Sequence, residues 1–537
     1  MKDSVLNDQT DNPEDIDWDY IIVGTGIGGA TLGFRLAQEG KKVLFCEKGR
    51  SLFATSGEFS GDYAEQFFPI RKSPSEEDHE VLEQSGRWPF KIKDVSAKKT
   101  KSFIPFMGVG TGGSSSLYGA AMERFKPEDF EAGRWHFDAE ESSIPEKWPI
   151  TYDELSSYYE LAEKLYRVRG DNMSFAAPPL SNANKELYDF LQKQGMHPYR
   201  LPIACEFSSN KCNTCQGYLC SEACKNDSSK ICLEPALTRY GATLLDQCEV
   251  EKIHSSKNKI TAIHAEWKGS QIRLKGKHFV LAAGALVTPV ILLRSATEKY
   301  PSGLANHSGM VGKNLMRHFV DMYVFHSGIK PQKYENIKEI AFNDFYCSTK
   351  MKFGTVQSFG WMPPADILVE TIEQDIHNTA FAFAAYLYRG IKPIIRPMVE
   401  QMLCNRLILA STLEDLPYTD NRVFPDGNSG IKFTYKIKDY DKRRIKRFRT
   451  ELKQVFKPLR HILIKQAENN ERLAHVCGTC RMGDDPATSV VDKFNRVHDF
   501  DNLTIIDSSF FPSSGGANPS LTIAANALRV ADHLLSL

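Results

Sequence analysis

Residues 19–49 read DYIIVGTGIGGATLGFRLAQEGKKVLFCEKG, and this stretch decides the fold of the N-terminal part of the chain. Residues 19–23 predict a strand, and a G-x-G-x-x-G turn follows at Gly24, Gly26 and Gly29. In such a turn the first glycine permits the tight bend, the second lets a pyrophosphate approach the backbone, and the third lets the helix pack closely on the strand. A helix and then a second strand over residues 42–46 complete a unit that predicts dinucleotide binding.

An acidic residue stands where the second strand ends. Glu47 lies 18 residues after Gly29, a position at which a carboxylate accepts hydrogen bonds from ribose hydroxyls. The helix that follows the glycines presents unpaired N–H groups and the positive end of its dipole to phosphates. We therefore expect Glu47 at a ribose and the start of the helix at a pyrophosphate.

The C-terminal segment distinguishes between dinucleotides. Residues 502–507 predict a strand that ends in Asp507, and a loop and an amphipathic helix beginning near Pro519 follow it. A second helix N-terminus close to the first suits an extended, flavin-bearing dinucleotide. The sequence thus favours FAD over a nicotinamide dinucleotide.

Bulk composition excludes several classes of protein. The 537 residues are enough for two to four domains or one large interleaved pair. Lys+Arg and Asp+Glu balance at 67 each, so the whole-chain charge gives no indication of a nucleic-acid or membrane partner. Residues 1–17 lack the apolar stretch of a secretory signal and predict a disordered acidic tail. Residues 379–388 form the longest apolar run, which is too short to be a transmembrane segment and predicts a buried strand or helix. A cytoplasmic location is therefore expected.

Nucleotide-binding patterns recur in separated segments of the chain. We expect an α/β protein whose Rossmann-like FAD-binding domain comprises residues 18–175, 231–320 and 471–537. Residues 176–230 form a Cys-rich insertion, and residues 321–470 a substrate-binding domain of sheet plus helices.

Within residues 321–470, the stretch 421–437 predicts two strands joined by a turn. Residues 442–457 predict an amphipathic helix whose basic residues lie mostly on its solvated face. The aromatic residues of the 379–388 run suggest an apolar substrate pocket, although they are equally expected in a plain core. These aromatic residues are Phe381, Phe383, Tyr386 and Tyr388.

Several further motifs resemble those of the glucose–methanol–choline (GMC) oxidoreductases, a family of FAD-dependent alcohol oxidases and dehydrogenases. The resemblance covers nearly the whole chain. Its motifs are DYIIVGTGIGGA (19–30), GVGTGGSSSLYGAAMERF (108–125), WPITYDELSSYYELAE (148–163), VLAAGALVTPVILLRS (280–295), GMVGKNLMRH (309–318), EDLPYTDNRV (414–423), HVCGTCRMG (475–483) and NPSLTI (518–523).

The resemblance implies where FAD binds. The loop from Gly110 to Ser116 would wrap the pyrophosphate and flavin, because small residues let the backbone touch the cofactor. The family's commonest pattern has Asn before the second glycine, whereas here Tyr118 precedes Gly119. Some relatives attach FAD through a histidine of this loop; none is present here, which implies non-covalent FAD. The predicted cofactor-binding residues are Gly24, Gly26, Ile27, Gly28, Gly29, Glu47, Gly110, Gly112, Gly113, Ser114, Ser115, Val250, Ala283, Gly284, Asp507 and Pro519.

The resemblance also implies a catalytic pair, His475 and Asn518. His475 begins the H-x-x-G-T-C-R-M-G motif, and Asn518 precedes Pro519. An imidazole can take a hydroxyl proton near neutral pH, and an amide can hydrogen-bond the alcohol oxygen. The implied reaction is oxidation of a primary or secondary alcohol by hydride transfer to flavin. The sequence leaves the substrate undefined, as well as the electron acceptor, which could be oxygen, a quinone or a redox protein.

Six of the twelve cysteines fall between residues 205 and 232. Cys212, Cys215, Cys220 and Cys224 follow a C-x2-C-x4-C-x3-C pattern, which can hold zinc or an iron–sulfur cluster but misses the bacterial ferredoxin spacing. Reduced structural cysteines are the favoured interpretation, with a disulfide as the remaining alternative to a metal, so we predict no metal. A cluster would instead favour an electron-transfer flavoprotein subunit. A non-redox lyase and a fatty-acid photodecarboxylase are further alternatives within the family.

Overall fold

In the computed structural model, five parallel strands form the sheet that carries the nucleotide-binding motifs. The structure describes residues 12–53, 58–68, 75–207, 212, 216–326, 331, 335, 337–348, 351–377 and 383–537. The strand order is β20-β12-β1-β2-β8. The strands are β1 (Trp18–Val23), β2 (Val43–Cys46), β8 (Thr243–Leu245), β12 (Gly276–Leu281) and β20 (Leu503–Ile505).

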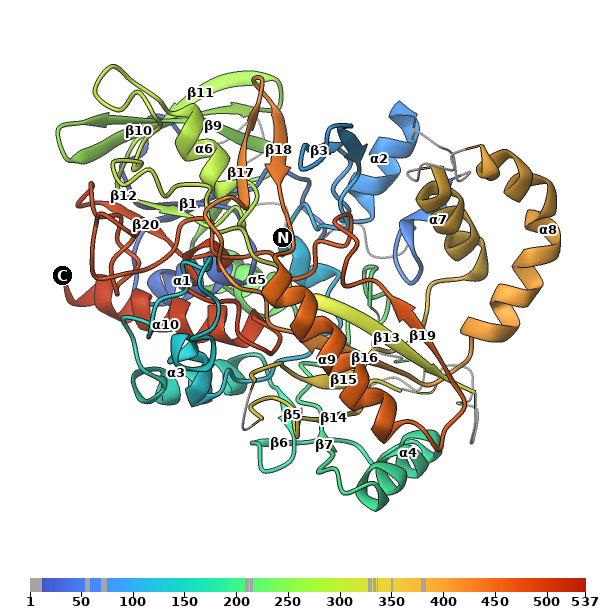
Figure 1. The fold of residues 1–537 in the computed structure, drawn as a ribbon. Coiled ribbons are helices and arrows are strands. Elements are labelled where there is room, and N and C mark those ends of the chain that lie inside the picture. The colour runs from blue at the N-terminus through green and yellow to red at the C-terminus, as the bar shows by residue number, and fades with distance from the viewer. Residues whose placement is uncertain are drawn as a thin grey trace.

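The register of this sheet aligns the carboxyl ends of its central strands. Val23 lies beside both Cys46 and Leu281, and Leu281 lies beside Ile505. The segments that follow these four residues therefore emerge at one edge, where ligands bind in sheets of this kind. Helices α1 (Ile27–Gln38) and α10 (Ser520–Ser536) pack together along the sheet (Figure 1).

Antiparallel sheets make up most of the remaining strands. The three-stranded sheet comprises β9 (Cys248–Ser256), β10 (Lys259–Trp267) and β11 (Ser270–Leu274). The six-stranded sheet runs in the order β19 (His461–Lys465), β13 (Phe319–Phe325), β16 (Ile408–Leu413), β15 (Val356–Ser358), β14 (Ile340–Phe342) and β7 (Tyr199–Arg200). A mixed four-stranded sheet joins β17 (Arg422–Asp426) and β18 (Gly430–Thr434) to β3 (Ile92–Asp94) and β4 (Lys101–Phe103). The hairpin predicted over residues 421–437 is therefore confirmed as β17–β18. A short parallel pair links β5 (Arg169–Gly170) and β6 (Phe175–Ala176).

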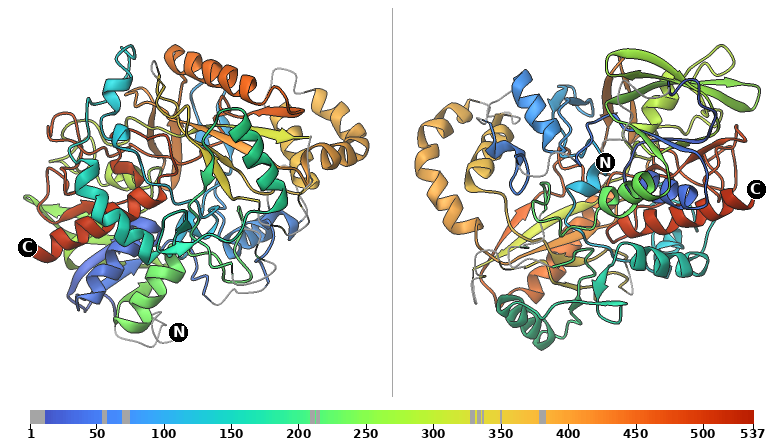
Figure 2. Two further views of the ribbon diagram at one scale, coloured as in Figure 1. Left: turned by 90° about the horizontal axis from the view of Figure 1, so that it is seen from below. Right: turned by 180° about the vertical axis from the view of Figure 1, so that it is seen from behind.

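Helices cover these sheets and their edges (Figure 2). Thr151 caps α3 through a reciprocal pair of hydrogen bonds with Glu154, which explains where that helix begins. The remaining helices are α2 (Glu76–Gln84), α3 (Tyr152–Leu165), α4 (Asn182–Lys193), α5 (Glu234–Arg239), α6 (Thr288–Arg294), α7 (Ala365–His377), α8 (Ala384–Leu403) and α9 (Asp439–Val455). Short helical turns are η1 (Ala64–Gln66), η2 (Gly113–Ser116), η3 (Pro127–Asp129), η4 (Ala132–Trp135), η5 (Ser229–Leu233) and η6 (Ser508–Phe510). None of the helices among the described residues is long and apolar enough to cross a membrane.

The apolar run at 379–388 differs from its predicted burial. Its described part belongs to α8, on which Phe383 is 65% exposed and Tyr386 67% exposed. Only Tyr388 of the three described aromatics is buried, because the opposite face of α8 packs on α7. Phe381 lies outside the described residues. The exposed Phe383 and Tyr386 therefore do not line the apolar pocket that the sequence suggested.

Two other expectations need adjustment. The helix predicted over 442–457 is confirmed as α9, but Arg444 is fully buried instead of lying on the solvated face. Its guanidinium donates to Asp441 at 2.8 Å and to the carbonyl of Glu414 at 2.9 Å, which compensates its charge. Near the N-terminus, Glu14 accepts a hydrogen bond from the backbone of Arg273 at 2.7 Å, although it was expected in a disordered tail.

Candidate active site

Glycines shape the turn between β1 and α1. Gly24 has a φ of +99°, and a Cβ atom on it would lie 2.4 Å from the carbonyl oxygen of Ala282. A Cβ on Gly28 would lie 2.2 Å from the carbonyl oxygen of Ile506. Gly26, by contrast, faces open space, with no atom within 4 Å of a built Cβ. No side chain caps the N-terminus of α1, so its first N–H groups, from Ile27 on, face that space.

The glycine- and serine-rich loop lies directly against this turn. The backbone N–H of Gly112 donates to Thr25 Oγ1 at 3.2 Å, and a Cβ on Gly113 would approach Gly26 Cα to 3.3 Å. Ser115 Oγ donates to the carbonyl of Gly112 at 2.7 Å, which closes the loop on itself. Ser114 is exposed, and its Oγ accepts from the backbone of Gly108. The structure thus brings together the two loops that the sequence assigned to the pyrophosphate.

Glu47 ties these loops together. One carboxylate oxygen accepts from Thr25 N at 3.0 Å and Thr25 Oγ1 at 2.7 Å. The other accepts from Gly49 N and Gly110 N, both at 3.1 Å. Burial raises the pKa of this carboxyl, and the four hydrogen bonds oppose that shift. Because four donors occupy the carboxylate, a ribose hydroxyl would have to replace one of them, and Thr25 Oγ1 can rotate away.

The ends of β12 and β20 add a second acidic position. Asp507 Oδ2 accepts from Gly284 N at 2.9 Å and from Thr288 Oγ1 at 2.5 Å. Ala283 and Gly284 are partly accessible here, and no atom lies within 4 Å of a Cβ built on Gly284. Val250 lies on β9, which is held to the end of β2 by a hydrogen bond from Cys248 N to the carbonyl of Glu47 at 2.8 Å. All predicted cofactor residues of the first sheet therefore gather at its carboxyl edge.

His475 occupies a left-handed backbone conformation, with a φ of +57°. This region is sparsely populated by residues that carry a Cβ atom, and such residues concentrate at functional sites. The flanking chain holds it there. Ser508 Oγ donates to the carbonyl of Val476 at 2.7 Å, and Gly478 N donates to the carbonyl of Ser508 at 3.1 Å.

A second histidine contacts His475 directly. His318 Nδ1 lies 2.8 Å from His475 Nδ1, and His318 Nε2 lies 2.9 Å from the carbonyl oxygen of Gly515. A carbonyl only accepts, so His318 carries its proton on Nε2 and presents a bare Nδ1. His475 must then donate from Nδ1, which leaves its Nε2 unprotonated. The hydrogen bonds thus select one tautomer of His475.

Electrostatics keep both imidazoles neutral. Burial lowers the pKa of His475 well below its ordinary value, and any positive charge on the neighbouring His318 or on Lys338 would lower it further. Burial also lowers the pKa of His318, against the opposing effect of its carbonyl partners at Gly515 and Ser514. A neutral His475 is ready to accept a proton.

Asn518 and Pro519 stand at the start of α10. Asn518 is buried, and its Oδ1 has no hydrogen-bond partner among the described residues. Burial of an amide oxygen that has no hydrogen-bond partner costs free energy. This points to a bound group that donates a hydrogen bond to Oδ1. Pro519 is buried at the N-cap of α10, and Gly28 at the start of α1 lies close to Ile523 of α10. The two helix N-termini therefore converge, as the sequence predicted.

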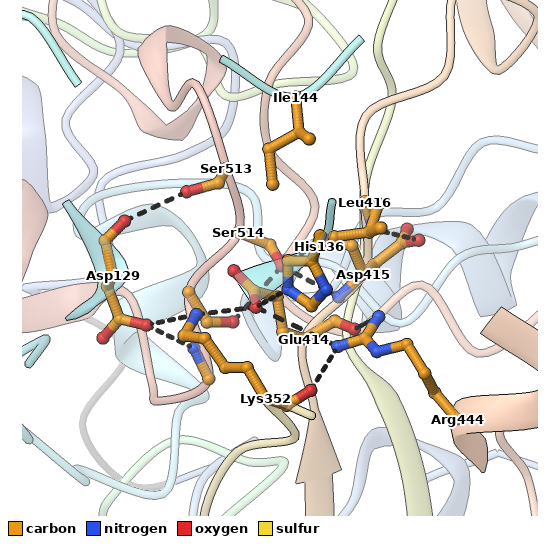
Figure 3. Close-up of polar contacts among 12 residues, drawn as sticks. Asp129, His136, Ile144, Lys352, Glu414, Asp415, Leu416, Arg444, Ser513 and Ser514 are labelled. Carbon is orange, nitrogen blue, oxygen red and sulfur yellow. Dashed lines mark hydrogen bonds and ion pairs between the residues drawn. The ribbon is translucent and has the colours of Figure 1, made fainter. Parts of the chain in front are cut away.

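A buried charge cluster supports the loop before Asn518 (Figure 3). Lys352 Nζ lies 2.6 Å from both Asp129 Oδ1 and Glu414 Oε2, and all three side chains are fully buried. His136 Nε2 contacts Glu414 at 2.9 Å, and burial lowers the pKa of His136 to about 4. A neutral His136 therefore donates to the carboxylate.

Hydrogen bonds connect this charge cluster to the loop of residues 513–516. Asp129 accepts from Gly516 N at 3.3 Å, and its carbonyl accepts from Ser513 Oγ at 3.3 Å. Asp415 N donates to Ser514 Oγ at 3.0 Å (Figure 3). The same loop offers the carbonyls that orient His318, so the cluster, the loop and the two histidines form one connected arrangement.

Two residues of this arrangement were not singled out from the sequence. His318 ends the GMVGKNLMRH segment, and its conspicuous place there was the only available indication. Lys338 is buried, and burial lowers its pKa to about 7. It acts on His475 electrostatically, across 137 residues of sequence, which no local pattern reveals.

The cysteine cluster is only partly described, because Cys215 lies outside the described residues. Cys205 Sγ and Cys212 Sγ lie 3.3 Å apart, and Cys224 is buried. Across the part of the chain that the structure describes, no three His, Cys, Asp or Glu side chains come together as a metal site.

Comparison with known proteins identifies relatives along almost the whole chain. A 6'''-hydroxyparomomycin C oxidase of Streptomyces lividus is 28% identical, covering 96% of this chain and 92% of the relative. A 2-methyl-1,2-propanediol dehydrogenase of Mycolicibacterium austroafricanum is 26% identical over 96% of this chain and 95% of its own length. The crystal structure of pyridoxine 4-oxidase from Mesorbium loti has the same fold, with a TM-score of 0.65 at 17% identity, covering 97% of this chain and all of that one.

Two family models locate these similarities on the sequence. Residues 18–320 match the N-terminal GMC oxidoreductase model, and residues 419–527 match the C-terminal one. The first contains both glycine-rich loops and His318, and the second contains His475, Asp507 and Asn518. The chain therefore belongs to the GMC oxidoreductase family.

Proposed function

We propose that this protein oxidises a primary or secondary alcohol to a carbonyl compound, with non-covalently bound FAD as the hydride acceptor. Two relatives, the 6'''-hydroxyparomomycin C oxidase and the 2-methyl-1,2-propanediol dehydrogenase, support an alcohol as the substrate. The observation that carries the proposal is the contact between His318 and His475, which leaves His475 Nε2 as a proton acceptor.

The cofactor residues fit an extended dinucleotide. Open space in front of Gly26 and Gly284, the uncapped N-terminus of α1 and its convergence with α10 suit a pyrophosphate. Glu47 would hold the ribose, and the backbone of Val250 would lie at the adenine. Asp507 would lie near the ribityl chain. We propose that residues 18–175, 231–320 and 471–537 form the FAD domain, and that residues 321–470 form the substrate domain.

The chain's own residues supply binding, orientation and proton transfer. FAD, when bound, supplies the hydride acceptor. The Nδ2 amide of Asn518 donates a hydrogen bond to the alcohol oxygen and leaves the hydroxyl proton for His475. His475 Nε2 takes the hydroxyl proton while the carbon loses a hydride, so one alcohol becomes one carbonyl, one protonated imidazole and one two-electron-reduced acceptor. His318 keeps His475 in the tautomer that performs this step.

Substitution of His475 tests the assignment. We expect His475→Ala to slow anaerobic reduction of the flavin by an alcohol substrate by about 10²-fold or more, because the proton acceptor is lost. Stopped-flow absorbance measures the rate, and the amount of flavin that co-purifies shows whether the site is intact. A variant that binds FAD and is reduced at the wild-type rate would remove His475 from the mechanism.

A further inference from the structure

Helix α8 carries an apolar stripe on its outer face. The structure exposes twelve large apolar side chains among the described residues, and seven of them lie on α8 or at its first turn. Their exposed fractions range from 42% at Met402 to 69% at Leu387. Such a concentration marks an interaction site, because single exposed apolar residues are normal but contiguous groups are not. The stripe comprises Leu387, Ile391, Ile394, Met398 and Met402.

The stripe follows from helical spacing. Its members recur every three or four residues, which places them along one side of a helix about 30 Å long. The other side of α8 already has a partner. Ile395 and Val399 pack against Val369 of α7 in a small core of their own. The stripe is thus a second apolar face on a helix whose first face is satisfied.

The cations of α8 are engaged by α7. Arg389 pairs with Glu373 at 2.5 Å, Lys392 with Glu370 at 2.5 Å, and Arg396 with Asp366 at 2.5 Å. Carboxylates of α7 therefore compensate the positive charges beside the stripe, and the stripe itself contains no charged residue. An interface helix has this composition, with Lys and Arg on its polar side and large apolar residues on the other.

The shape of α8 distinguishes between two possible partners of the stripe, a second protein surface and a lipid bilayer. Pro393 and Pro397 lie inside the helix, where proline bends the axis. Figures 1 and 2 show α8 curving around α7 at the edge of the molecule, with its convex side outward. Two convex helices touch only near their crossing, whereas a stable protein interface uses about 20–30 residues from each side. A deformable lipid surface can contact the whole stripe.

We propose that the outer stripe of α8 docks the protein on a lipid bilayer, with α8 lying in the plane of the interface. The apolar side chains enter the boundary between headgroups and acyl chains, and the ion pairs with α7 stay on the protein side. Because the stripe is uncharged, zwitterionic lipid is sufficient, and added salt does not release the protein.

Co-sedimentation of the full chain with phosphatidylcholine vesicles tests this docking. The double variant Leu387→Glu/Ile394→Glu places two charges in the stripe, and Phe137→Glu is the control because Phe137 is 78% exposed in a different part of the molecule. We expect the wild type and the control to bind equally, in low and high salt. We expect the double variant to bind at least about tenfold more weakly. Circular dichroism melting curves confirm that each variant is folded.

Three results would overturn the proposal. The wild type could fail to sediment with vesicles, or the folded double variant could bind as the wild type does. Alternatively, sedimentation velocity without lipid could show a dimer that the double variant dissociates, and the stripe would then be covered by a second copy. None of these readouts depends on substrate or on flavin reduction.

Discussion

At the scale of single residues, the arrangement of His318 and His475 is the most informative feature of the site. Two neutral histidines 2.8 Å apart can share only one proton between their Nδ1 atoms. The carbonyl of Gly515 determines which histidine donates, because it requires a proton on His318 Nε2. His318 is thus a positioning residue, and the free Nε2 of His475 follows from it.

Substitutions of His318 test this role. Asparagine can accept from His475 Nδ1 and donate to the carbonyl of Gly515, whereas phenylalanine can do neither. We expect His318→Phe to lower kcat for alcohol oxidation by about tenfold or more, with little change in KM, because a fraction of His475 adopts the wrong tautomer. His318→Asn should recover part of the loss. Equal activity of the two variants in steady-state kinetics would contradict a tautomer-selecting role.

The pH dependence of activity tests the electrostatic contribution of Lys338. Burial lowers the pKa of Lys338 to about 7, so below pH 7 the side chain is charged and disfavours protonation of His475. Removing that charge in Lys338→Met should raise the pKa of His475. The acidic limb of the kcat/KM profile, where activity is lost as His475 becomes protonated, should then move to higher pH. Lys432→Met, at the surface, serves as the control. If the acidic limb of Lys338→Met stays where it is in the wild type, Lys338 does not influence the pKa of His475.

At the scale of elements, the sequence predicted those parts that local periodicity and turn chemistry determine. The β1–α1–β2 unit, the β17–β18 hairpin, α9 and the start of α10 all lie where the pattern indicated. Burial of a charged residue such as Arg444 could not be predicted, because its distant partners Glu414 and Lys352 lie directly after β16 and in the segment before β15. The same limit applies to the exposed side of α8. An apolar run indicates a helix face, but whether a neighbour covers that face depends on distant segments.

The buried charge cluster gives a prediction about stability. Lys352→Met leaves Asp129 and Glu414 buried without their shared cation, and removing one partner of a buried pair costs about 3–5 kcal/mol. We expect a loss of this size in the free energy of unfolding, measured by urea denaturation. Lys432→Met removes a partly exposed pair with Asp426 and should cost less than about 1 kcal/mol. Similar values for the two variants would show that the cluster does not stabilise the fold.

At the scale of the whole molecule, the chain builds one site from segments that lie hundreds of residues apart. Register alone brings Gly24, Glu47, Gly284 and Asp507 to one sheet edge. That assembly was predictable, because parallel strands place their carboxyl ends together. The path from the charge cluster through residues 513–516 to His318 was not, since it depends on packing between the sheets. Whole-chain charge was likewise uninformative about α8, because an average over 537 residues hides one uncharged stripe.

Anaerobic titration of the purified, flavin-containing protein with a panel of alcohols shows whether it oxidises alcohols through its flavin. Loss of the yellow flavin absorbance reports hydride transfer, and the carbonyl product can be quantified in the same sample. We expect at least one alcohol to bleach the flavin and to yield one carbonyl for each flavin reduced. A protein that binds FAD but is bleached by no primary or secondary alcohol of the panel, or that binds no flavin, would contradict this expectation.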